Sequence, residues 1–359
     1  MTPLDALIRK RILNDGPMRL DQFMEIALSD IDHGYYTTRA PIGAPKVNGG
    51  DFTTAPEISQ VFGDMLGLWL VDLWQRMGAP TLLHLAELGP GRGTLASDIA
   101  RVLEKFGADK AIRQHLVEIS PTLTQAQKEK CPKAKHHLTI DTLPQDAPII
   151  IIANEFFDAL PIRQYKQHLG NWLECYIIVD SQDALSFEFL PTTEHPFLTP
   201  TDVSAGDIIE DCPAAQSILR HLCLRLSAQG GCFLTFDYGS ETAGTGDTLQ
   251  AMKAHQYADP LREVGLCDLT SHVHFSALTH IAKQEDVTVY QTLKQGAFLQ
   301  HIGIDQRTQN LMKENPSRIA QLQAERDRLI APDQMGALFK VFAVANKNMP
   351  NLAGLEPIK

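Results

Sequence analysis

The chain of 359 residues lacks several features that mark particular classes of protein. Its six cysteines include no CxxC pair and no Cys/His spacing typical of zinc, so we expect no metal and predict buried thiols in a reducing compartment. Basic residues are not in excess, and the net charge of −11 argues against a nucleic acid as the main partner. The longest wholly aliphatic run, Ile149–Ala153, is far too short to span a membrane.

The N-terminal segment shows no targeting signal. Residues 1–20 carry basic side chains but no apolar h-region, and Asp5 and Asp15 argue against a mitochondrial presequence. We therefore expect a cytoplasmic protein with no stable membrane insertion. A chain of this length can bury a large core, and its 44% of hydrophobic residues is ordinary for a globular protein.

The most informative segment is Leu82–Thr94, which reads LLHLAELGPGRGT. An apolar run ends in Glu87, and a turn with three glycines in five residues follows. The next stretch, Leu95–Phe106, has apolar residues at helical spacing. The pattern predicts a strand, a tight loop and a helix, which together direct backbone N–H groups at a nucleotide-like ligand.

Two details of the loop indicate which ligand it binds. A dinucleotide loop reads G-x-G-x-x-G, but here Gly89, Gly91 and Gly93 are each two residues apart, and Thr94 replaces the third glycine. Glu87 would repel a pyrophosphate and suits a cationic ligand with an amino group. S-adenosylmethionine (SAM) carries a sulfonium and an amino group and has no phosphate. The loop therefore predicts SAM, and an NAD-dependent oxidoreductase is disfavoured.

Two further apolar runs also end in acids. Gln114–Glu118 closes 27 residues after Gly91, and in doubly wound folds the acid that ends the second strand takes the ribose hydroxyls. We predict this role for Glu118, with a solvated strand-end carboxylate as the alternative. His137–Ile140 is followed by Asp141, which we expect near the adenine.

The fourth strand predicts the side on which the methyl acceptor binds. It runs over residues 149–153 and is followed by Asn154 and Glu155, where the switch-point rule puts the acceptor in a SAM-binding fold. A buried carboxylate is unfavourable there without a cationic partner, which points to a cationic acceptor. The alternative is that Glu155 caps a following helix. Asp237, at the end of a later strand, is either an acid that supports the cleft or simply a loop residue.

The remaining pattern divides the chain into an N-terminal helical region, residues 1–80, and an α/β domain, residues 81–348, with antiparallel strands inserted at 162–210. The predicted helices cover residues 4–13, 20–28, 58–77, 211–229 and 275–283. The predicted strands cover residues 82–87, 114–118, 137–140, 149–153, 162–167, 172–179, 185–190, 232–236, 287–292 and 338–345.

Long motifs occur in a fixed order along the chain. They are GDFTTAPEISQVFGDM, ELGPGRGTL, VEISPTLTQAQ, ANEFFDALPIRQ, FDYG, GDTLQAMKAHQYADPL, DLTSHVHF and GAFLQHIGI. From about residue 15 to residue 345, the chain resembles the MidA-type SAM-dependent methyltransferases. That family includes the mitochondrial protein-arginine methyltransferase that assists assembly of respiratory complex I.

The resemblance implies a class I SAM-methyltransferase fold, of α/β class and with a Rossmann-like sheet. It also implies a protein substrate and symmetric dimethylation of an arginine, on a complex I subunit or its bacterial counterpart. Carried over to this chain, the resemblance implies that the methionine portion of SAM contacts Glu87, Gly89, Gly91 and Gly93, and that the ribose contacts Glu118. It also implies that the acceptor side is lined by Asn154 and Glu155, and that the pocket is closed by Thr53, Thr54 and Glu57. The implied mechanism pairs Glu155 with a second carboxylate, Glu57 or Asp237, around the guanidinium.

Three features depart from the family pattern. His274 stands where bacterial members usually have an acid, Asp64 stands where they have a glutamate, and Lys46–Asn48 resembles a small insertion. These departures bear on the identity of the acceptor more than on SAM binding. Two other functions therefore stay open: a small-molecule SAM methyltransferase, and a SAM-binding assembly factor without essential catalysis. The sequence leaves the oligomeric state open.

Overall fold

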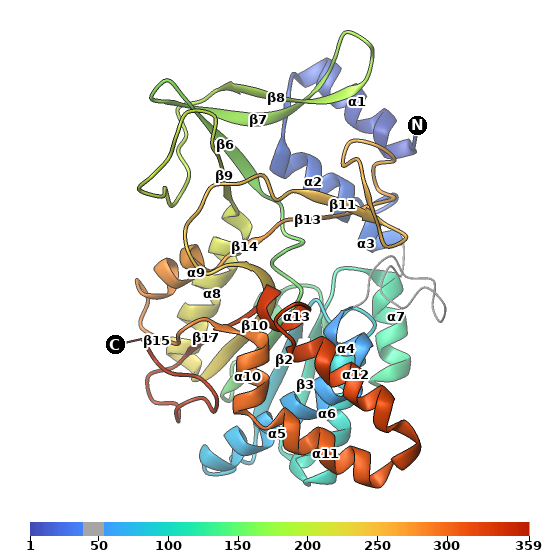
Figure 1. Ribbon diagram of the computed structural model, residues 1–359, viewed down its shortest axis with the longest axis vertical. Helices are drawn as coiled ribbons and strands as arrows, with labels where there is room; N and C mark the ends of the chain where they lie inside the picture. The colour runs from blue at the N-terminus through green and yellow to red at the C-terminus, as the bar shows by residue number, and fades with distance from the viewer. Residues whose placement is uncertain (39–53, 359) are drawn as a thin grey trace. The chain divides into compact units, whose positions relative to one another are not determined.

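The computed structural model describes residues 1–38 and 54–358 and divides into two compact units (Figure 1). The first unit comprises Met1–Phe52, Phe157–Leu219 and Ser240–Ile281, and the second comprises Thr53–Phe156, Arg220–Gly239 and Ala282–Lys359. Two helices, α8 (Pro213–Gln229) and α9 (Phe275–Ala282), have residues in both units.

The second unit is built on a sheet whose strands run in the order β15-β17-β10-β5-β2-β3-β4, with β16 also paired to β17. The strands are β2 Leu83–Leu88, β3 Ile112–Val117, β4 Lys135–His137, β5 Ile149–Asn154, β10 Gly231–Ser240, β15 Thr288–Val289, β16 Leu293–Lys294 and β17 Phe339–Ala345. From β4 to β10 neighbouring strands are parallel, whereas β17 is antiparallel to β10. The order reverses at β2 and β5, so the carboxyl ends of these two strands form the topological switch point at which α/β folds bind ligands.

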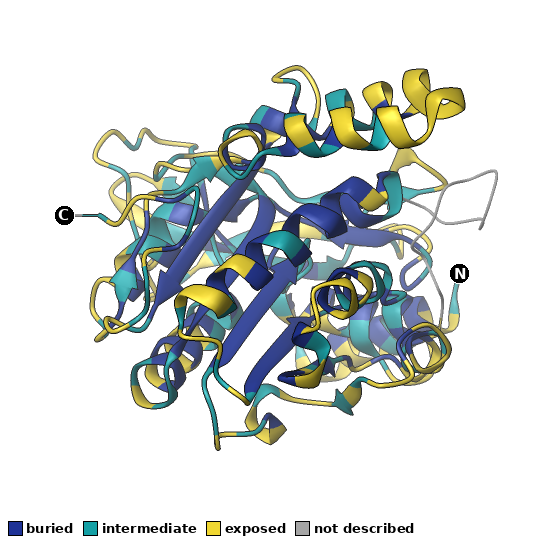
Figure 2. Ribbon diagram, turned by 90° about the horizontal axis from the view of Figure 1, so that it is seen from below, coloured by how far each residue is buried: buried dark blue, intermediate teal, exposed yellow. Residues whose placement is uncertain are grey.

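Helices surround this sheet and bury its central strands. The helices are α4 Ala55–Ile58, α5 Gln60–Arg76, α6 Thr94–Lys105, α7 Pro121–Lys130, α10 Gln295–His301, α11 Ile304–Glu314, α12 Ile319–Ile330 and α13 Met335–Leu338, with 3-10 turns η1 Ala108–Lys110, η2 Ile140–Thr142 and η3 Pro316–Arg318. Every residue of β2 and β5 is buried, as Figure 2 shows for the strands in dark blue. An uninterrupted apolar strand such as Ile149–Ile152 needs this cover on both faces.

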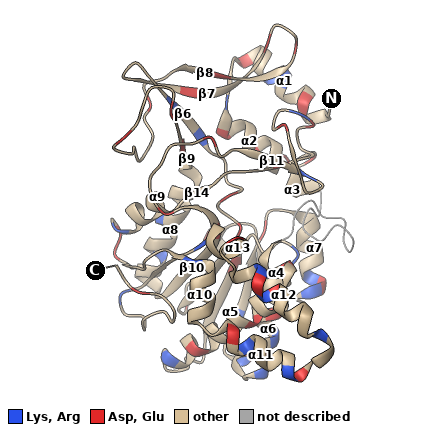
Figure 3. Cartoon of the chain, in the orientation of Figure 1, with Lys and Arg blue, Asp and Glu red and all other residues tan. Residues whose placement is uncertain are grey.

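The main core of the second unit lies between the sheet and α5, α6 and α10. Phe236 of β10 is at its centre, with its ring 5.2 Å from that of Phe62 on α5 and 5.6 Å from that of Phe298 on α10. Along α11 and α12, Figure 3 shows residues of both charge signs. The two helices therefore present mixed charge to solvent while their apolar sides join the core.

The first unit holds two antiparallel sheets. One has the strand order β1-β7-β6-β9 with β8 paired to β7, and the other has the order β12-β11-β13. The elements are α1 Pro3–Asp15, β1 Met18–Arg19, α2 Leu20–Ser29, α3 Tyr35–Thr38, β6 Arg163–His168, β7 Asn171–Val179, β8 Leu185–Pro191, β9 Ile208–Asp211, β11 Gln250–Lys253, β12 Gln256–Ala258, β13 Asp268–Thr270 and β14 Val273–His274. The apolar sides of α1 and α2 pack with residues of β7 and β13 in one core.

Most of the predicted elements are present, with differences at short strands. The strand expected at 137–140 is β4, which ends at His137, and Ile140 belongs to the turn η2. Within the range 287–292 expected as one strand, the structure has the two-residue strand β15, and β16 follows from Leu293. The pattern also missed β9 and β11–β13, because strands of three or four residues give too short an alternation to detect. Of the helices within the described residues, none combines the length and the apolar character that crossing a membrane requires.

Candidate functional site

The glycine loop after β2 has the backbone that its sequence predicts. Gly89, Gly91 and Gly93 all have positive φ, at 61°, 53° and 74°, in the left-handed region that disfavours residues with a Cβ. A Cβ on Gly89 would also come within 2.9 Å of the Phe156 ring. Gly93 is the N-cap residue of α6. The loop therefore presents backbone at the carboxyl end of β2 and leads into a helix N-terminus.

Side chains from the end of α7 hold this loop in place. Gln127 donates from Nε2 to the carbonyl oxygen of Gly91 at 2.6 Å. Lys130 donates to the Thr94 hydroxyl at 2.6 Å, and the Cys131 thiol lies 3.4 Å from the Gly93 carbonyl oxygen. Sequence reasoning missed this contribution. The sequence feature that could have indicated it is Gln127, which lies four residues after Leu123 on the inner face of the helix, where an apolar residue is expected.

Glu118 follows β3 and is buried beside the loop. One carboxylate oxygen accepts the Ser120 amide at 2.8 Å, and the other accepts Gln127 Nε2 at 3.2 Å. Burial raises the pKa of Glu118 to about 7. The next residue, Ile119, is 52% exposed, and Leu138 after β4 is also exposed. An acid with exposed apolar side chains at one sheet edge suits a ligand that joins a sugar to a flat ring.

Glu87, the last acid of β2 before the loop, is also buried. Burial and, to a smaller extent, the nearby charge of Glu118 raise its pKa to about 8, although the Ala96 amide donates a hydrogen bond to its carboxylate. Its Oε2 atom has no hydrogen-bond partner within the described part of the chain. The side chain lines a small cavity together with Ala96 and Gln114. Glu87 therefore lies underneath the loop, at the start of α6.

Asn154 and Glu155 form the turn at the carboxyl end of β5. Glu155 has a φ of 51°, which is unusual for a residue other than glycine and is a feature found at functional sites. Its Oε1 accepts hydrogen bonds from Asn154 Nδ2 at 2.9 Å and from the Ala55 amide at 3.3 Å. The next element along the chain is the strand β6, so the alternative of a helix cap for Glu155 is wrong.

Asp237 of β10 fixes this turn from the neighbouring strand. Its Oδ2 accepts the Phe156 amide at 3.2 Å, and the Glu155 amide donates to the Phe236 carbonyl oxygen at 2.8 Å. Asp237 is fully buried. The structure therefore brings Asp237, Asn154 and Glu155 together at one end of β5 and β10.

Glu57 and Thr54 reach the site from the segment before α5. Glu57 on α4 accepts a short hydrogen bond from the hydroxyl of Thr94, the residue that replaces the third glycine. Thr54 is buried at the N-terminus of α4, and its side chain makes no capping hydrogen bond. Thr53 and Lys46–Asn48 lie outside the described residues. Thr94 thus connects Glu57 to Lys130.

Asp141 lies apart from this group. It is an exposed residue of η2 whose carboxylate is 3.5 Å from His221 Nε2. No hydrogen bond or ion pair of the described residues joins it to the loop, to Glu118 or to Glu155, and its predicted role near the adenine stays a prediction.

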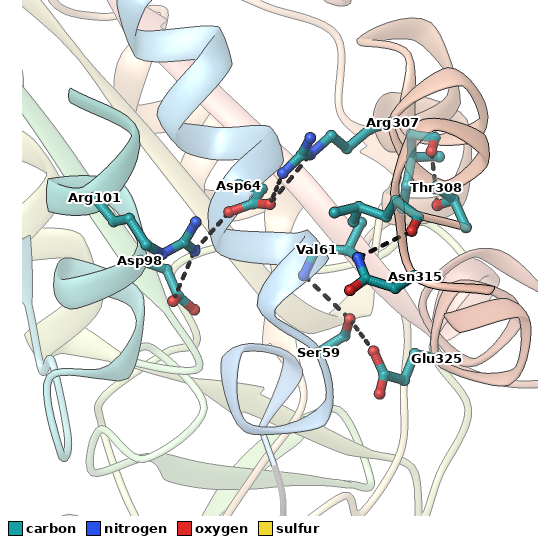
Figure 4. A network of polar contacts seen from close by, with 11 residues as sticks. Ser59, Val61, Asp64, Asp98, Arg101, Arg307, Thr308, Asn315 and Glu325 are labelled. Carbon is teal, nitrogen blue, oxygen red and sulfur yellow. Dashed lines mark hydrogen bonds and ion pairs between the residues drawn. The ribbon is translucent and has the colours of Figure 1, made fainter. Parts of the chain in front are cut away.

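Asp64, one of the departures from the family pattern, lies between two arginines of neighbouring helices (Figure 4). Its carboxylate is 2.7 Å from Arg101 of α6 and 2.6 Å from Arg307 of α11, and its side chain is 1% exposed. It therefore joins three helices. His274 belongs to the first unit, where its Nε2 lies 3.9 Å from Glu210. Among residues 1–38 and 54–358, no three His, Cys, Asp or Glu side chains could jointly hold a metal ion.

The residues of the second unit fit SAM. The loop exposes backbone at positions where any side chain would be strained, which is the cradle that a large ligand needs. Asn154 Oδ1 is buried without a hydrogen-bond partner within the described residues, so it is ready to accept a hydrogen bond from an amino group. Two buried acids, Glu87 and Glu118, lie beside the loop and suit a cationic ligand.

Comparison with known proteins supports the same conclusion. A family model described as "Putative S-adenosyl-L-methionine-dependent methyltransferase" matches residues 65–293. The Danio rerio protein named "Protein arginine methyltransferase NDUFAF7, mitochondrial" is 37% identical over 370 residues, which cover 94% of this chain and 86% of the relative. The Homo sapiens protein of the same name is 34% identical over 379 residues, which cover 96% and 83%.

The structure has a similar counterpart. A crystal structure of a Burkholderia thailandensis protein bound to S-adenosyl-homocysteine matches with a TM-score of 0.87 at 26% identity, covering 98% of this chain and 93% of that chain. The likeness in sequence confirms the predicted family, and the likeness in structure confirms the predicted α/β fold class. The chain therefore belongs to the family of S-adenosyl-L-methionine-dependent methyltransferases, enzymes that take their methyl group from this cofactor.

Proposed function

We propose that the protein transfers the methyl group of SAM to a guanidinium nitrogen of an arginine in a protein substrate. The observation that carries the proposal is Glu155, a carboxylate held in a left-handed turn at the switch point of the sheet. The two relatives described above are named protein arginine methyltransferases, which supports the same acceptor. The product proposed from the family resemblance is symmetric dimethylarginine.

The cofactor is proposed to bind over the glycine loop. SAM supplies an electrophilic methyl group on a positively charged sulfur. Gly89, Gly91 and Gly93 give the methionine portion close access to backbone, and Glu87 supplies negative charge beneath them. Glu118 accepts hydrogen bonds from the ribose hydroxyls, while Ile119 packs against the adenine.

Glu155 is proposed to bind and orient the acceptor. Arginine stays protonated in proteins, so a carboxylate attracts it without first removing a proton. The hydrogen bonds from Asn154 and Ala55 to Oε1 hold the orientation of this carboxylate, which places its negative charge toward the acceptor. As the bond between the guanidinium nitrogen and the methyl carbon forms, the bond from that carbon to sulfur breaks, S-adenosylhomocysteine is the leaving group, and Glu155 takes the proton that leaves the nitrogen.

Two further acids are given different roles. Glu57, held by Thr94, is proposed as a second carboxylate at the guanidinium and, with Thr53 and Thr54, as part of the segment that closes the pocket. Asp237 is proposed as a positioning residue, because its oxygen holds the Phe156 amide directly after Glu155. Asp141 is proposed to lie near the adenine.

The protein substrate is proposed to be a subunit of respiratory complex I or its bacterial counterpart, as the family resemblance implies. The cytoplasmic location stays a prediction, and the relatives are named mitochondrial.

Labelled SAM tests the proposal. Purified protein is incubated with [methyl-³H]SAM and extract from cells that lack the enzyme, and the protein fraction is hydrolysed for amino-acid analysis. We expect label in symmetric dimethylarginine. Glu155→Gln should lower this labelling by at least about 100-fold while SAM affinity changes less than about threefold, because its role is in the transition state. Glu104→Gln, on the exposed face of α6, is the matched control.

Three outcomes would contradict the proposal. Label found only in small molecules would identify a small-molecule methyltransferase. SAM binding without any turnover would favour an assembly factor that retains the cofactor as a structural ligand. Equal loss of labelling and of SAM affinity in Glu155→Gln would show that Glu155 binds the cofactor and not the acceptor.

A further inference from the structure

The first unit contains a cavity that the reaction proposed above does not use. Its walls are formed by β9, by the first residues of α8 and by residues 271–278. Most of the lining is apolar and includes Ile162, Leu198, Ile209 and Leu278. Glu210 and His274 give the cavity a polar side.

Glu210 is a buried carboxylate that accepts hydrogen bonds from neutral donors. It is 5% exposed, and one oxygen accepts Gln164 Nε2 at 2.9 Å and the Thr248 amide at 2.9 Å. The other oxygen accepts a short hydrogen bond from the Thr248 hydroxyl. Burial acts to raise the pKa of Glu210, but contacts with His274, Thr248 and Gln164 outweigh it and hold the pKa below its ordinary value. The carboxylate is therefore ionised at neutral pH.

The charge around Glu210 is not balanced by a permanent cation. Within the described residues its ion-pair partner is His274, at 3.9 Å, and a histidine is charged only when protonated. Asp247 accepts a hydrogen bond from the same Gln164 amide at 2.8 Å, and Asp211 also lines the cavity. The polar side of the cavity is therefore acidic and suits a cationic ligand.

The cavity also offers free hydrogen-bonding capacity. A carboxylate has about four acceptor positions, and three of those on Glu210 are used by Gln164 and Thr248. Ser276 Oγ is a buried atom without a hydrogen-bond partner within the described residues, and Ser276 lines the cavity. Apolar walls with one anionic side match a side chain that has an aliphatic stem and a cationic end.

We propose that this cavity binds a basic side chain of the protein substrate, an arginine or a lysine, with Glu210 as its anionic contact. The proposal rests on the proposed function for the statement that the ligand belongs to a protein substrate. The binding step itself involves no methyl transfer, so it can be measured separately. The site would give the enzyme a second point of recognition on basic segments of its substrate.

Calorimetric titration of the full-length protein with small probes tests the inference. n-Butylguanidine represents the arginine side chain, n-pentylamine represents lysine, and n-pentanol is the neutral control of similar length. We expect at least one of the two cations to bind about tenfold or more tightly than pentanol. The stronger of the two identifies the preferred residue.

Variants locate the binding. Glu210→Gln should weaken binding of the cations about tenfold or more and leave pentanol unchanged. Ala277→Phe, which fills the cavity and keeps Glu210, should weaken all three probes and covers the case in which Glu210→Gln does not fold. Glu188→Gln, an exposed carboxylate on β8, is the matched control and should bind as wild type does. SAM titration of each variant reports whether the second unit is intact.

The results distinguish failure of this inference from failure of the proposed function. Cations that bind wild type and Glu210→Gln equally, or no more tightly than pentanol, overturn the inference even where arginine methylation is intact. Conversely, cation binding that depends on Glu210, in a protein that methylates no arginine, would support the binding site in the cavity and would overturn the proposed function.

Discussion

The side chain of Gln127 donates a 2.6 Å hydrogen bond to the carbonyl oxygen of Gly91. The same Nε2 atom is 3.2 Å from Glu118 Oε2, and Gln127 is fully buried. One amide therefore connects the glycine loop, proposed for the methionine portion of SAM, to the acid proposed for its ribose. The position of α7 consequently determines the distance between these two parts of the cofactor site.

Replacement of Gln127 should weaken SAM binding with little loss of fold. In Gln127→Leu the loop and Glu118 each lose a buried hydrogen bond, which costs about 1–3 kcal/mol. We expect SAM affinity, measured by calorimetry, to fall about tenfold or more. Gln125→Leu, an exposed position on the same helix, is the control and should keep its affinity. Unchanged affinity in Gln127→Leu would show that the loop holds its shape without α7.

Alanine substitutions at Gly89 and at Gly107 distinguish the effect of backbone strain from the effect of damage to the proposed cofactor site. Both have positive φ, at 61° and 70°, so an alanine at either position is strained by about 1–2 kcal/mol. A Cβ at Gly107 meets nothing within 4 Å, whereas at Gly89 it comes within 2.9 Å of Phe156. Gly107→Ala should lower thermal stability only. Gly89→Ala should lower SAM affinity in addition, and similar SAM affinity in the two variants would argue against the loop as the cofactor site.

The sequence could predict the parts of the site that depend on short-range pattern. Glu87, the glycines and Glu118 follow from strands that end in acids and from a loop with a recognisable spacing. The contribution of α7 could not be predicted, because a glutamine on a helix gives no indication of which distant carbonyl it meets. The pairing of Asp64 with Arg101 and Arg307 depends on how three helices pack, which local periodicity does not determine. The cavity at Glu210 is formed by segments far apart in the chain, and the short strand β9 gives no signal of its own.

Cofactor binding should release protons. Burial raises the pKa values of Glu87 to about 8 and of Glu118 to about 7, so both are partly protonated near neutral pH in the free protein. A cationic ligand favours the ionised carboxylates, and SAM affinity should therefore increase from pH 6 to pH 9. Calorimetry at pH 7.5 in phosphate and in Tris should give different enthalpies, since the buffer takes up the released protons. Equal enthalpies in the two buffers would show that neither acid ionises on binding.

The same two acids affect stability without ligand. An acid whose pKa is raised on folding stabilises the folded state most fully below its unfolded value of 4.5, and this contribution is lost as pH rises through the folded pKa. Free protein should therefore become less stable between pH 6 and pH 9, and saturating SAM should reduce this decline. Thermal unfolding with and without SAM over this range measures both effects.

A row of three histidines should make the second unit sensitive to acid. His84 Nδ1 is 3.0 Å from His115 Nε2, and His115 Nδ1 is 2.9 Å from His137 Nε2. Burial and the two neighbouring imidazoles lower the pKa of His115 to about 3, from an ordinary value of 6.5. The neutral form is favoured in the folded protein, so its contribution is complete above pH 6.5 and is lost as pH falls toward 3.

Denaturant unfolding as a function of pH measures this effect. Each proton taken up on unfolding changes the free energy of unfolding by about 1.4 kcal/mol per pH unit, so the loss between pH 6.5 and pH 4 should be steep. His115→Leu removes one titrating group and should reduce the slope, even though the variant is less stable at pH 8 because two imidazoles lose a partner. His255→Leu, in the first unit, is the control and should keep the wild-type slope. The same slope in both variants would assign the acid sensitivity to other groups.

Asp64 should prove structural. Its carboxylate is 1% exposed and contacts both Arg101 and Arg307, so Asp64→Asn leaves two guanidinium groups without their shared anion. Removal of one partner from a buried ion pair typically costs about 3–5 kcal/mol, and here the partial exposure of both arginines reduces the expected loss to about 2–3 kcal/mol. Asp72→Asn on the same helix breaks an exposed pair with Arg76 and should cost less than about 1 kcal/mol. Urea unfolding compares the two variants, and calorimetry should find wild-type SAM affinity in both. A loss of SAM affinity in Asp64→Asn with stability unchanged would contradict this assignment, because it would mean that the carboxylate acts on the cofactor site and does not hold the helices together.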